Sequence, residues 1–83
     1  MSRDLVSFML PTPAKLTARS VKDMFREVGL GGDVVKIWED LGMIFIKKGI
    51  WVPIGEYILF CRVITRLGAR YRKDYGVYIL QVG

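Results

Sequence analysis

The chain has 83 residues, of which 52% are hydrophobic and 25% are charged, and its formal net charge is +5. This length and apolar content exclude a multidomain protein and extensive intrinsic disorder, so we expect a single domain over residues 1–83. The single cysteine excludes an intrachain disulfide, and the lack of histidine excludes Ser-His and Cys-His nucleophile pairs.

The first predicted element is a short, mostly apolar strand at Leu5–Leu10, which Pro11 ends. Arg3 and Asp4 lie just before it, so the chain does not open with the pattern of a secretory signal peptide. The uncharged runs of the sequence are also far shorter than the roughly 20 residues that cross a bilayer. We therefore expect a cytoplasmic protein that has no membrane partner.

A helix is predicted from about Pro13 to Val28. Thr12 and Pro13 have the residue types of an N-cap and a first helical position. Glycines at positions 29, 31 and 32 would end the helix, because glycine takes the left-handed C′ conformation at little cost. Five apolar residues recur at helical spacing and form one stripe, namely Leu16, Val21, Met24, Phe25 and Val28.

Two strands are predicted next, at Asp33–Trp38 and Met43–Lys48. Residues 39–42 between them end in glycine, which predicts a β-hairpin with a four-residue loop. Gly49–Gly55 is expected to be a connection, since a proline and two glycines disfavour a central strand. Its apolar residues are either tucked under the domain or form an interface: Ile50, Trp51, Val52 and Ile54.

Residues 56–67 are compatible with a helix or a strand. Propensity favours a strand, because the segment is rich in β-branched residues. Periodicity and the stop signal at Gly68 favour a helix, and we predict a helix. Its apolar stripe would consist of Tyr57, Phe60, Cys61, Ile64, Leu67 and Tyr71. Its opposite side would carry a basic row of Arg62, Arg66, Arg70 and Lys73.

A closing strand is predicted at Gly76–Val82. If Ala69–Arg72 is also extended, residues 73–76 form a hairpin turn. The order β-α-β-β-α-β predicts an α+β two-layer sandwich of the ferredoxin-like arrangement, with two helices on an antiparallel sheet. The alternatives are β-α followed by an antiparallel meander or small barrel, and a winged-helix arrangement with residues 56–67 as the recognition helix.

The excess of positive over negative charge is confined to the second half of the chain. Residues 1–40 hold six basic and six acidic side chains, whereas residues 41–83 hold seven basic and two acidic ones, which is the whole net charge of +5. Such an uneven charge distribution is typical of proteins that bind a polyanion or an acidic protein. Five of the bases share one segment with two tyrosines: Arg62, Arg66, Arg70, Tyr71, Arg72, Lys73 and Tyr75.

This Arg62–Tyr75 segment is the main candidate site. Arginine binds phosphates through two hydrogen bonds and tyrosine rings stack on unpaired bases, so the segment predicts nucleic-acid binding. The alternative interpretations are a solvated face or contact with an acidic protein. Lys47 and Lys48, which precede Trp51, either add a phosphate contact or, the interpretation we favour, protect an edge strand while Trp51 packs in the core.

The sequence contains few candidate catalytic residues. Cys61 falls on the apolar side of its segment in either interpretation and is expected to be a buried thiol. Asp23 and Glu27 are surrounded by basic residues, as on a solvated helix face. The sequence therefore predicts no enzyme activity, no catalytic residues, no metal and no cofactor.

We therefore expect a small non-catalytic protein that binds RNA or DNA through a basic Arg/Tyr face. The alternative is an interaction subunit or adaptor of a larger complex, in one form a homodimer, because apolar residues are abundant for so short a chain. The chain has no asparagine and one glutamine, and low amide content is typical of proteins from hot-growing sources.

Overall fold

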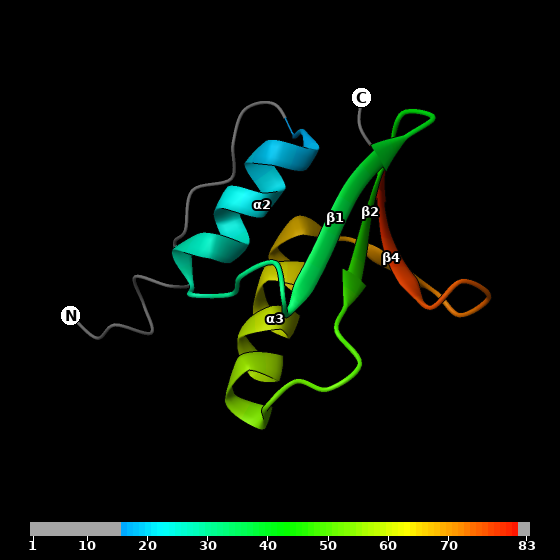
Figure 1. Cartoon of the computed structure of the whole chain (residues 1–83). Coiled ribbons are helices and arrows are strands. Elements are labelled where there is room, and N and C mark those ends of the chain that lie inside the picture. Colours follow the sequence, from blue (N-terminus) through cyan, green and yellow to red (C-terminus); the bar gives the residue numbers. More distant parts are fainter. Residues whose placement is uncertain (1–15, 82–83) are drawn as a thin grey trace.

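The computed structural model describes residues 16–81, which form a four-stranded antiparallel sheet with two helices on one side of it (Figure 1). The strands lie in the order β1-β2-β4-β3. In chain order the elements are α2 (Ala18–Glu27), β1 (Val35–Asp40), β2 (Met43–Lys48), α3 (Ile54–Leu67), β3 (Arg70–Arg72) and β4 (Val77–Gln81). The α+β class is confirmed.

The strand order gives no support to the ferredoxin-like arrangement. In that arrangement the first strand of the chain lies beside the third, and the last strand lies at an edge of the sheet. Here β4 lies directly beside β2, and β3 forms the edge beyond it. Because α3 separates β2 from β3, the described strands do not form a simple meander either. The predicted strand at Leu5–Leu10 lies outside the described residues.

α2 begins at Ala18 and not at the predicted Pro13. Thr17 has an extended backbone and is the N-cap, and it exchanges two hydrogen bonds with Ser20. The Ser20 N–H donates to Thr17 Oγ1 at 3.1 Å, and the Thr17 N–H donates to Ser20 Oγ at 2.8 Å. This capping box defines the helix start. The predicted cap, Thr12, lies outside the described residues.

The other end of α2 confirms the predicted glycine stop. Gly29 has a φ of +85°, and its N–H donates to the carbonyl of Arg26 at 2.9 Å. The Leu30 N–H donates to the carbonyl of Phe25 at 2.9 Å, which completes a Schellman motif. Leu30 is buried in the core, so it anchors the segment that connects α2 to β1.

A two-residue turn, Leu41-Gly42, joins β1 to β2 in place of the predicted four-residue loop. Both residues have positive φ, +51° and +73°, as in a type I′ turn, whose twist matches that of the flanking strands. The strands therefore stay paired up to the turn itself. The shorter turn sets the register, in which Trp38 lies opposite Phe45.

The helix predicted for residues 56–67 is confirmed, and α3 runs from Ile54 to Leu67. Gly68 ends it with a φ of +72°, and its N–H donates to the carbonyl of Ile64 at 3.0 Å. The predicted basic row along one long helix is wrong, because the helix stops before Arg70. The predicted hairpin turn at residues 73–76 is confirmed between β3 and β4.

The core lies between the two helices and the facing side of the sheet. Phe25 of α2 stacks on Phe60 of α3, with the ring centroids 5.5 Å apart. Glu39 of β1 accepts a hydrogen bond from the Ala18 N–H at 3.3 Å, which ties the start of α2 to the sheet. The side chains with the lowest exposure are Val21, Phe25, Ile44, Ile46 and Phe60.

Candidate functional site

The side of the sheet that faces away from both helices carries alternate residues of the hairpin. Val35 and Ile37 of β1, and Ile44 and Ile46 of β2, are buried in the core. Successive side chains of a strand point to opposite faces. The intervening residues therefore lie on the other face, namely Lys36, Trp38, Asp40, Met43, Phe45 and Lys47.

The strands β3 and β4 extend this surface. The Tyr71 ring contacts the Tyr78 ring at 4.9 Å between centroids, and Tyr78 contacts Phe60 of α3 at 5.4 Å. Tyr71 and Tyr78 therefore face the helices, and their strand neighbours face away. We call the whole surface the open face; its members on these strands are Arg70, Arg72, Val77, Ile79 and Gln81.

A row of apolar side chains crosses the centre of the open face and ends in an arginine. The register places Trp38 opposite Phe45, Phe45 opposite Ile79, and Ile79 opposite Arg70. The rings of Trp38 and Phe45 stack, with centroids 5.5 Å apart and planes 12° from parallel. Trp38 keeps 41% of its surface exposed, so its ring is available to a ligand.

We call the row of Trp38, Phe45, Ile79 and Arg70 the aromatic row, and two further rows flank it, one on each side. On one side Lys36 lies opposite Lys47, and Arg72 lies opposite Val77, so this row is cationic. On the other side Asp40 lies opposite Met43, and Met43 lies opposite Gln81, so this row ends in a carboxylate and an amide. Residues two apart in a strand are separated by about 6.7 Å, which is the spacing between the rows.

A hollow of about 490 Å³ lies on the part of this surface that β3 and β4 form. β3 is only three residues long, so it leaves the edge of β4 partly uncovered. Arg70, Arg72 and Gln81 all border the hollow. The complete lining is Met43, Gly68, Arg70, Arg72, Ile79, Leu80 and Gln81.

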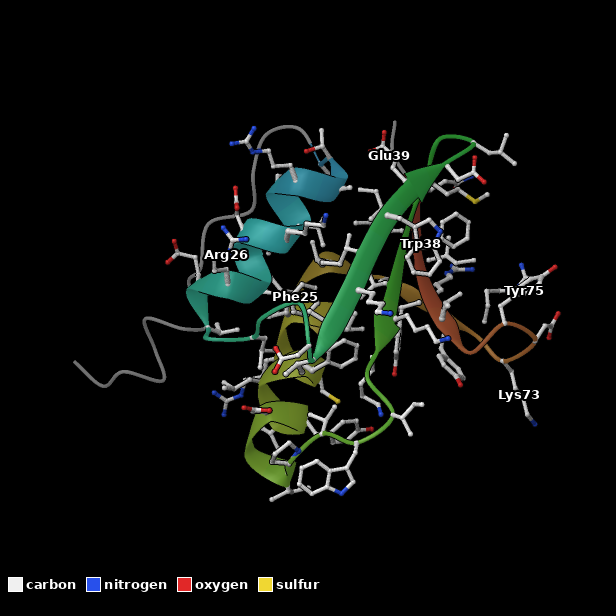
Figure 2. All side chains as sticks on the ribbon, viewed as in Figure 1. Phe25, Arg26, Trp38, Glu39, Lys73 and Tyr75 are labelled. Atoms are coloured by element: carbon white, nitrogen blue, oxygen red, sulfur yellow. The ribbon has the colours of Figure 1, made fainter. Side chains whose placement is uncertain are left out.

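Arg72 has two neighbours in the β3–β4 turn. Its guanidinium lies 3.5 Å from the Asp74 carboxylate and 5.7 Å from the centre of the Tyr75 ring. Both members of the ion pair are well exposed, so the pair adds little stability. Figure 2 shows Tyr75 and Lys73 on this turn, on the same side of the molecule as Trp38.

The structure divides the predicted site residues between two sides of the sheet. Lys47, Arg70 and Arg72 are on the open face, and Tyr75 adjoins them through Arg72. Lys73 is exposed in the turn. Tyr71 faces the helices, where its ring contacts Tyr78. The Arg62–Tyr75 segment is therefore not one continuous surface.

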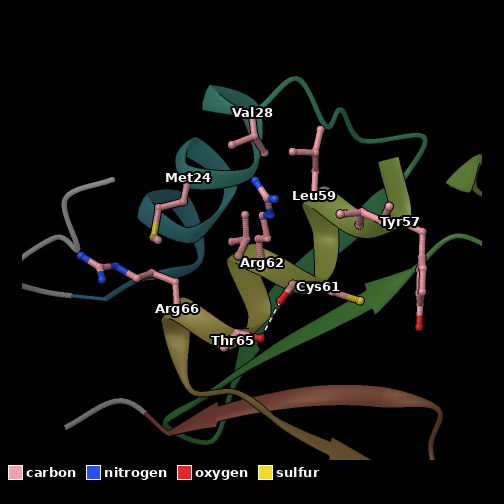
Figure 3. A pocket seen from close by; sticks show the side chains of 10 residues that line it. Met24, Val28, Tyr57, Leu59, Cys61, Arg62, Thr65 and Arg66 are labelled. Atoms are coloured by element: carbon pink, nitrogen blue, oxygen red, sulfur yellow. Dashed lines mark hydrogen bonds between the residues drawn. The ribbon is translucent and has the colours of Figure 1, made fainter. Parts of the chain in front are cut away.

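Arg62 and Arg66 lie on α3, far from the open face. They line a separate hollow of about 610 Å³ on the helix side, together with Met24 of α2 and Val28, the residue that follows this helix (Figure 3). The remaining lining residues come from α3. This hollow is largely apolar, so the two arginines do not form part of one cationic surface with Arg70.

The favoured interpretation, in which Lys47 and Lys48 protect an edge strand while Trp51 packs in the core, is wrong. β2 lies between β1 and β4, and Trp51 is 84% exposed, not packed in the core. Lys48 faces the helix side, where its Nζ donates to the Gly49 carbonyl at 3.1 Å and lies 5.7 Å from the centre of the Tyr57 ring. Lys47 alone of the two lysines reaches the open face.

Sequence reasoning missed the aromatic centre of this surface. The alternation of aliphatic residues in the two hairpin strands could have revealed it, because this alternation assigns Lys36, Trp38 and Phe45 to one face of the sheet. The predicted four-residue loop placed Trp38 opposite Met43, so the stack with Phe45 was not anticipated.

Two tyrosines on the helix side have raised pKa values. The hydrogen bond to Cys61 is the main cause that raises the pKa of Tyr57, and burial is the main cause that raises the pKa of Tyr78. Both groups stay neutral at physiological pH. Cys61 is half-buried and packs against the core, so it is more accessible than predicted.

No three His, Cys, Asp or Glu side chains among residues 16–81 lie together as a metal ion requires. Within the same part of the chain, neither helix is both long and apolar enough to cross a membrane. Comparisons with protein-family models, with curated proteins and with solved structures find no match to this chain.

Proposed function

We propose that this protein binds single-stranded nucleic acid on the open face of its sheet. The observation that carries the proposal is the stacked pair of Trp38 and Phe45 beside a cationic row. Aromatic rings on an exposed sheet supply stacking surfaces for unpaired bases, and Lys and Arg beside them neutralise phosphates. The binding surface would then be the open face of the sheet and not the whole Arg62–Tyr75 segment.

Charge alone does not favour this surface over the rest of the molecule. Arg19, Lys22 and Arg26 on α2 are also exposed, but the same helix exposes Asp23 and Glu27 beside them. The open face combines four bases with one acid and two stacked rings. A stacked base contributes about 1–3 kcal/mol, and this energy is available only where the base is unpaired.

The test is fluorescence anisotropy with labelled single-stranded RNA, single-stranded DNA and duplex DNA at several salt concentrations. The double variant Lys47→Ala/Arg72→Ala, which removes two members of the cationic row, is compared with the wild type. It should bind more weakly, and the slope of log affinity against log salt should become less steep by about 1.4, because each phosphate contact with a single strand contributes about 0.7.

A matched control removes two cations from another part of the surface. Lys22 and Arg26 lie one turn apart on α2 and are both exposed. The variant Lys22→Ala/Arg26→Ala loses the same charge and should keep most of the affinity. If the two double variants weaken binding equally, the open face is not the site. If the wild type binds no nucleic acid at low salt, the proposed function is wrong.

A second candidate function is contact with protein, in the form of a homodimer. The β2–α3 connection and the first turns of α3 expose five large apolar or aromatic side chains: Ile50, Trp51, Ile54, Tyr57 and Ile58. Glu56 is the one charged residue between Ile50 and Ile58, so two copies of this patch would meet with little charge repulsion. A two-fold dimer requires such a self-complementary patch.

Light scattering over a range of protein concentrations tests the homodimer. A dimer that the variant Trp51→Ser/Ile54→Ser returns to monomer would support this second function. A strict monomer at the highest concentration would remove it.

A further inference from the structure

The three rows of the open face have different chemistry in a fixed order along the strands. The cationic row comes first, then the aromatic row, and then the row that contains Asp40 and Gln81. A nucleotide has a similar order, with its phosphate at one end, its base in the middle and the pairing edge of the base at the other end. The rows and the parts of a nucleotide thus correspond.

We infer that Asp40 and Gln81 read the pairing edge of a bound base, and that the open face therefore prefers cytosine to thymine or uracil. This inference rests on the proposed function, because it concerns the same surface. Phosphates over Lys36 and Lys47, with a base over the Trp38 row, would bring the pairing edge to Asp40. The nucleic-acid strand would then run across the β-strands, from β1 toward β3.

The preference follows from the hydrogen-bonding groups at the third row. An ionised carboxylate only accepts hydrogen bonds, and the 4-amino group of cytosine donates them. Thymine and uracil have a carbonyl oxygen at that position, which a carboxylate repels. The Gln81 amide both donates and accepts, so it can pair with the remaining acceptors of the cytosine edge.

The position of the third row also suits an edge-reading role. Asp40 is the last residue of β1, and both Asp40 and Gln81 are exposed. Met43 lies between them in the register and borders the hollow on the open face, as does Gln81. A base seated over Phe45 and Ile79 would have this hollow beneath its edge.

The experiment compares two labelled DNA strands of equal length, one all deoxycytidine and one all thymidine, at neutral pH and one salt concentration. The two bases are both pyrimidines of similar size, so stacking area is nearly equal. The wild type should bind the cytidine strand at least about fivefold more tightly, which is the lower end of the effect of one base-edge contact.

The variant Asp40→Asn identifies the residue responsible. Asparagine has the same shape but both donates and accepts, so the preference for cytidine should fall to roughly one. Removing a negative charge also strengthens binding of both strands, so Asp23→Asn on α2 serves as the charge-matched control and should keep the fivefold ratio. Circular dichroism of both variants shows whether the fold is retained.

The outcomes separate this inference from the proposed function. Equal affinity of the wild type for the two strands, or an unchanged ratio in Asp40→Asn, overturns the inference and leaves nucleic-acid binding in place. Failure to bind either strand at low salt overturns both.

Discussion

Trp38 of β1 and Phe45 of β2 lie directly opposite each other in the hairpin, and their ring planes are 12° from parallel. Cross-strand aromatic pairs stabilise a sheet by about 0.2–1 kcal/mol, so this exposed pair is not essential to the fold. The core residues behind it, Ile37 and Ile46, supply that stability. The rings of Trp38 and Phe45 can therefore contact a ligand without a large cost to the stability of the fold.

Trp38→Ala should weaken binding to single-stranded nucleic acid roughly 5- to 160-fold, because one stacked base contributes about 1–3 kcal/mol. Anisotropy at one salt concentration measures the loss. Thermal unfolding should change little, since Trp38 lies outside the core cluster.

Trp51 provides the control, because it is the other tryptophan of the chain and lies on the β2–α3 connection. In Trp51→Phe the remaining fluorescence comes from Trp38 and should be quenched when a base stacks on it. Quenching that persists instead in Trp38→Phe would show that the ligand sits near Trp51 and would contradict the stacking prediction.

Leu41→Asn should stabilise the protein by about 0.5–1 kcal/mol, because asparagine takes the left-handed conformation at a lower cost than leucine. Leu41 has a φ of +51° and is 86% exposed, so its side chain contributes little burial while its backbone is strained. Asn-Gly is the preferred pair for a type I′ turn. Urea unfolding followed by circular dichroism measures the gain, and Leu41→Ala, which retains the strain, should show none. Equal stability of the three proteins would contradict the strained turn.

Tyr78→Phe should reduce the loss of stability in alkaline solution. Burial raises the pKa of Tyr78 above its usual value of 10.0 in the folded state. The unfolded chain therefore loses this proton at lower pH than the folded protein does, and stability falls as the pH rises through 10.0 toward the folded pKa.

Urea midpoints measured at neutral pH and above pH 10 test this behaviour. The difference between the two midpoints should be smaller in Tyr78→Phe than in the wild type, because phenylalanine has no hydroxyl to ionise. Tyr75→Phe, an exposed tyrosine in the β3–β4 turn, should leave that difference unchanged. An identical alkaline loss in Tyr78→Phe and the wild type would contradict the prediction.

Local signals were sufficient for most element positions. Gly29 and Gly68 were correctly predicted to end their helices, because a left-handed residue is needed there whatever the tertiary context. The predicted start of α2 at Pro13 was wrong, because the helix begins after Thr17, which forms a capping box with Ser20. Helical periodicity outweighed β-branched propensity in residues 54–67, because packing on the sheet rewards an apolar stripe.

The sequence by itself determined the α+β class, the hairpins and which residues of each strand share a face, because side-chain alternation and glycine conformation are local properties. Only the tertiary structure decided which strands are neighbours and which side chains meet. β4 lies beside β2, so Ile79 and Arg70 continue the row that begins at Trp38. Strand pairing joins residues far apart in the chain, and the register of a hairpin depends on the length of its turn. Here the two-residue turn makes Phe45, and not Met43, the cross-strand partner of Trp38.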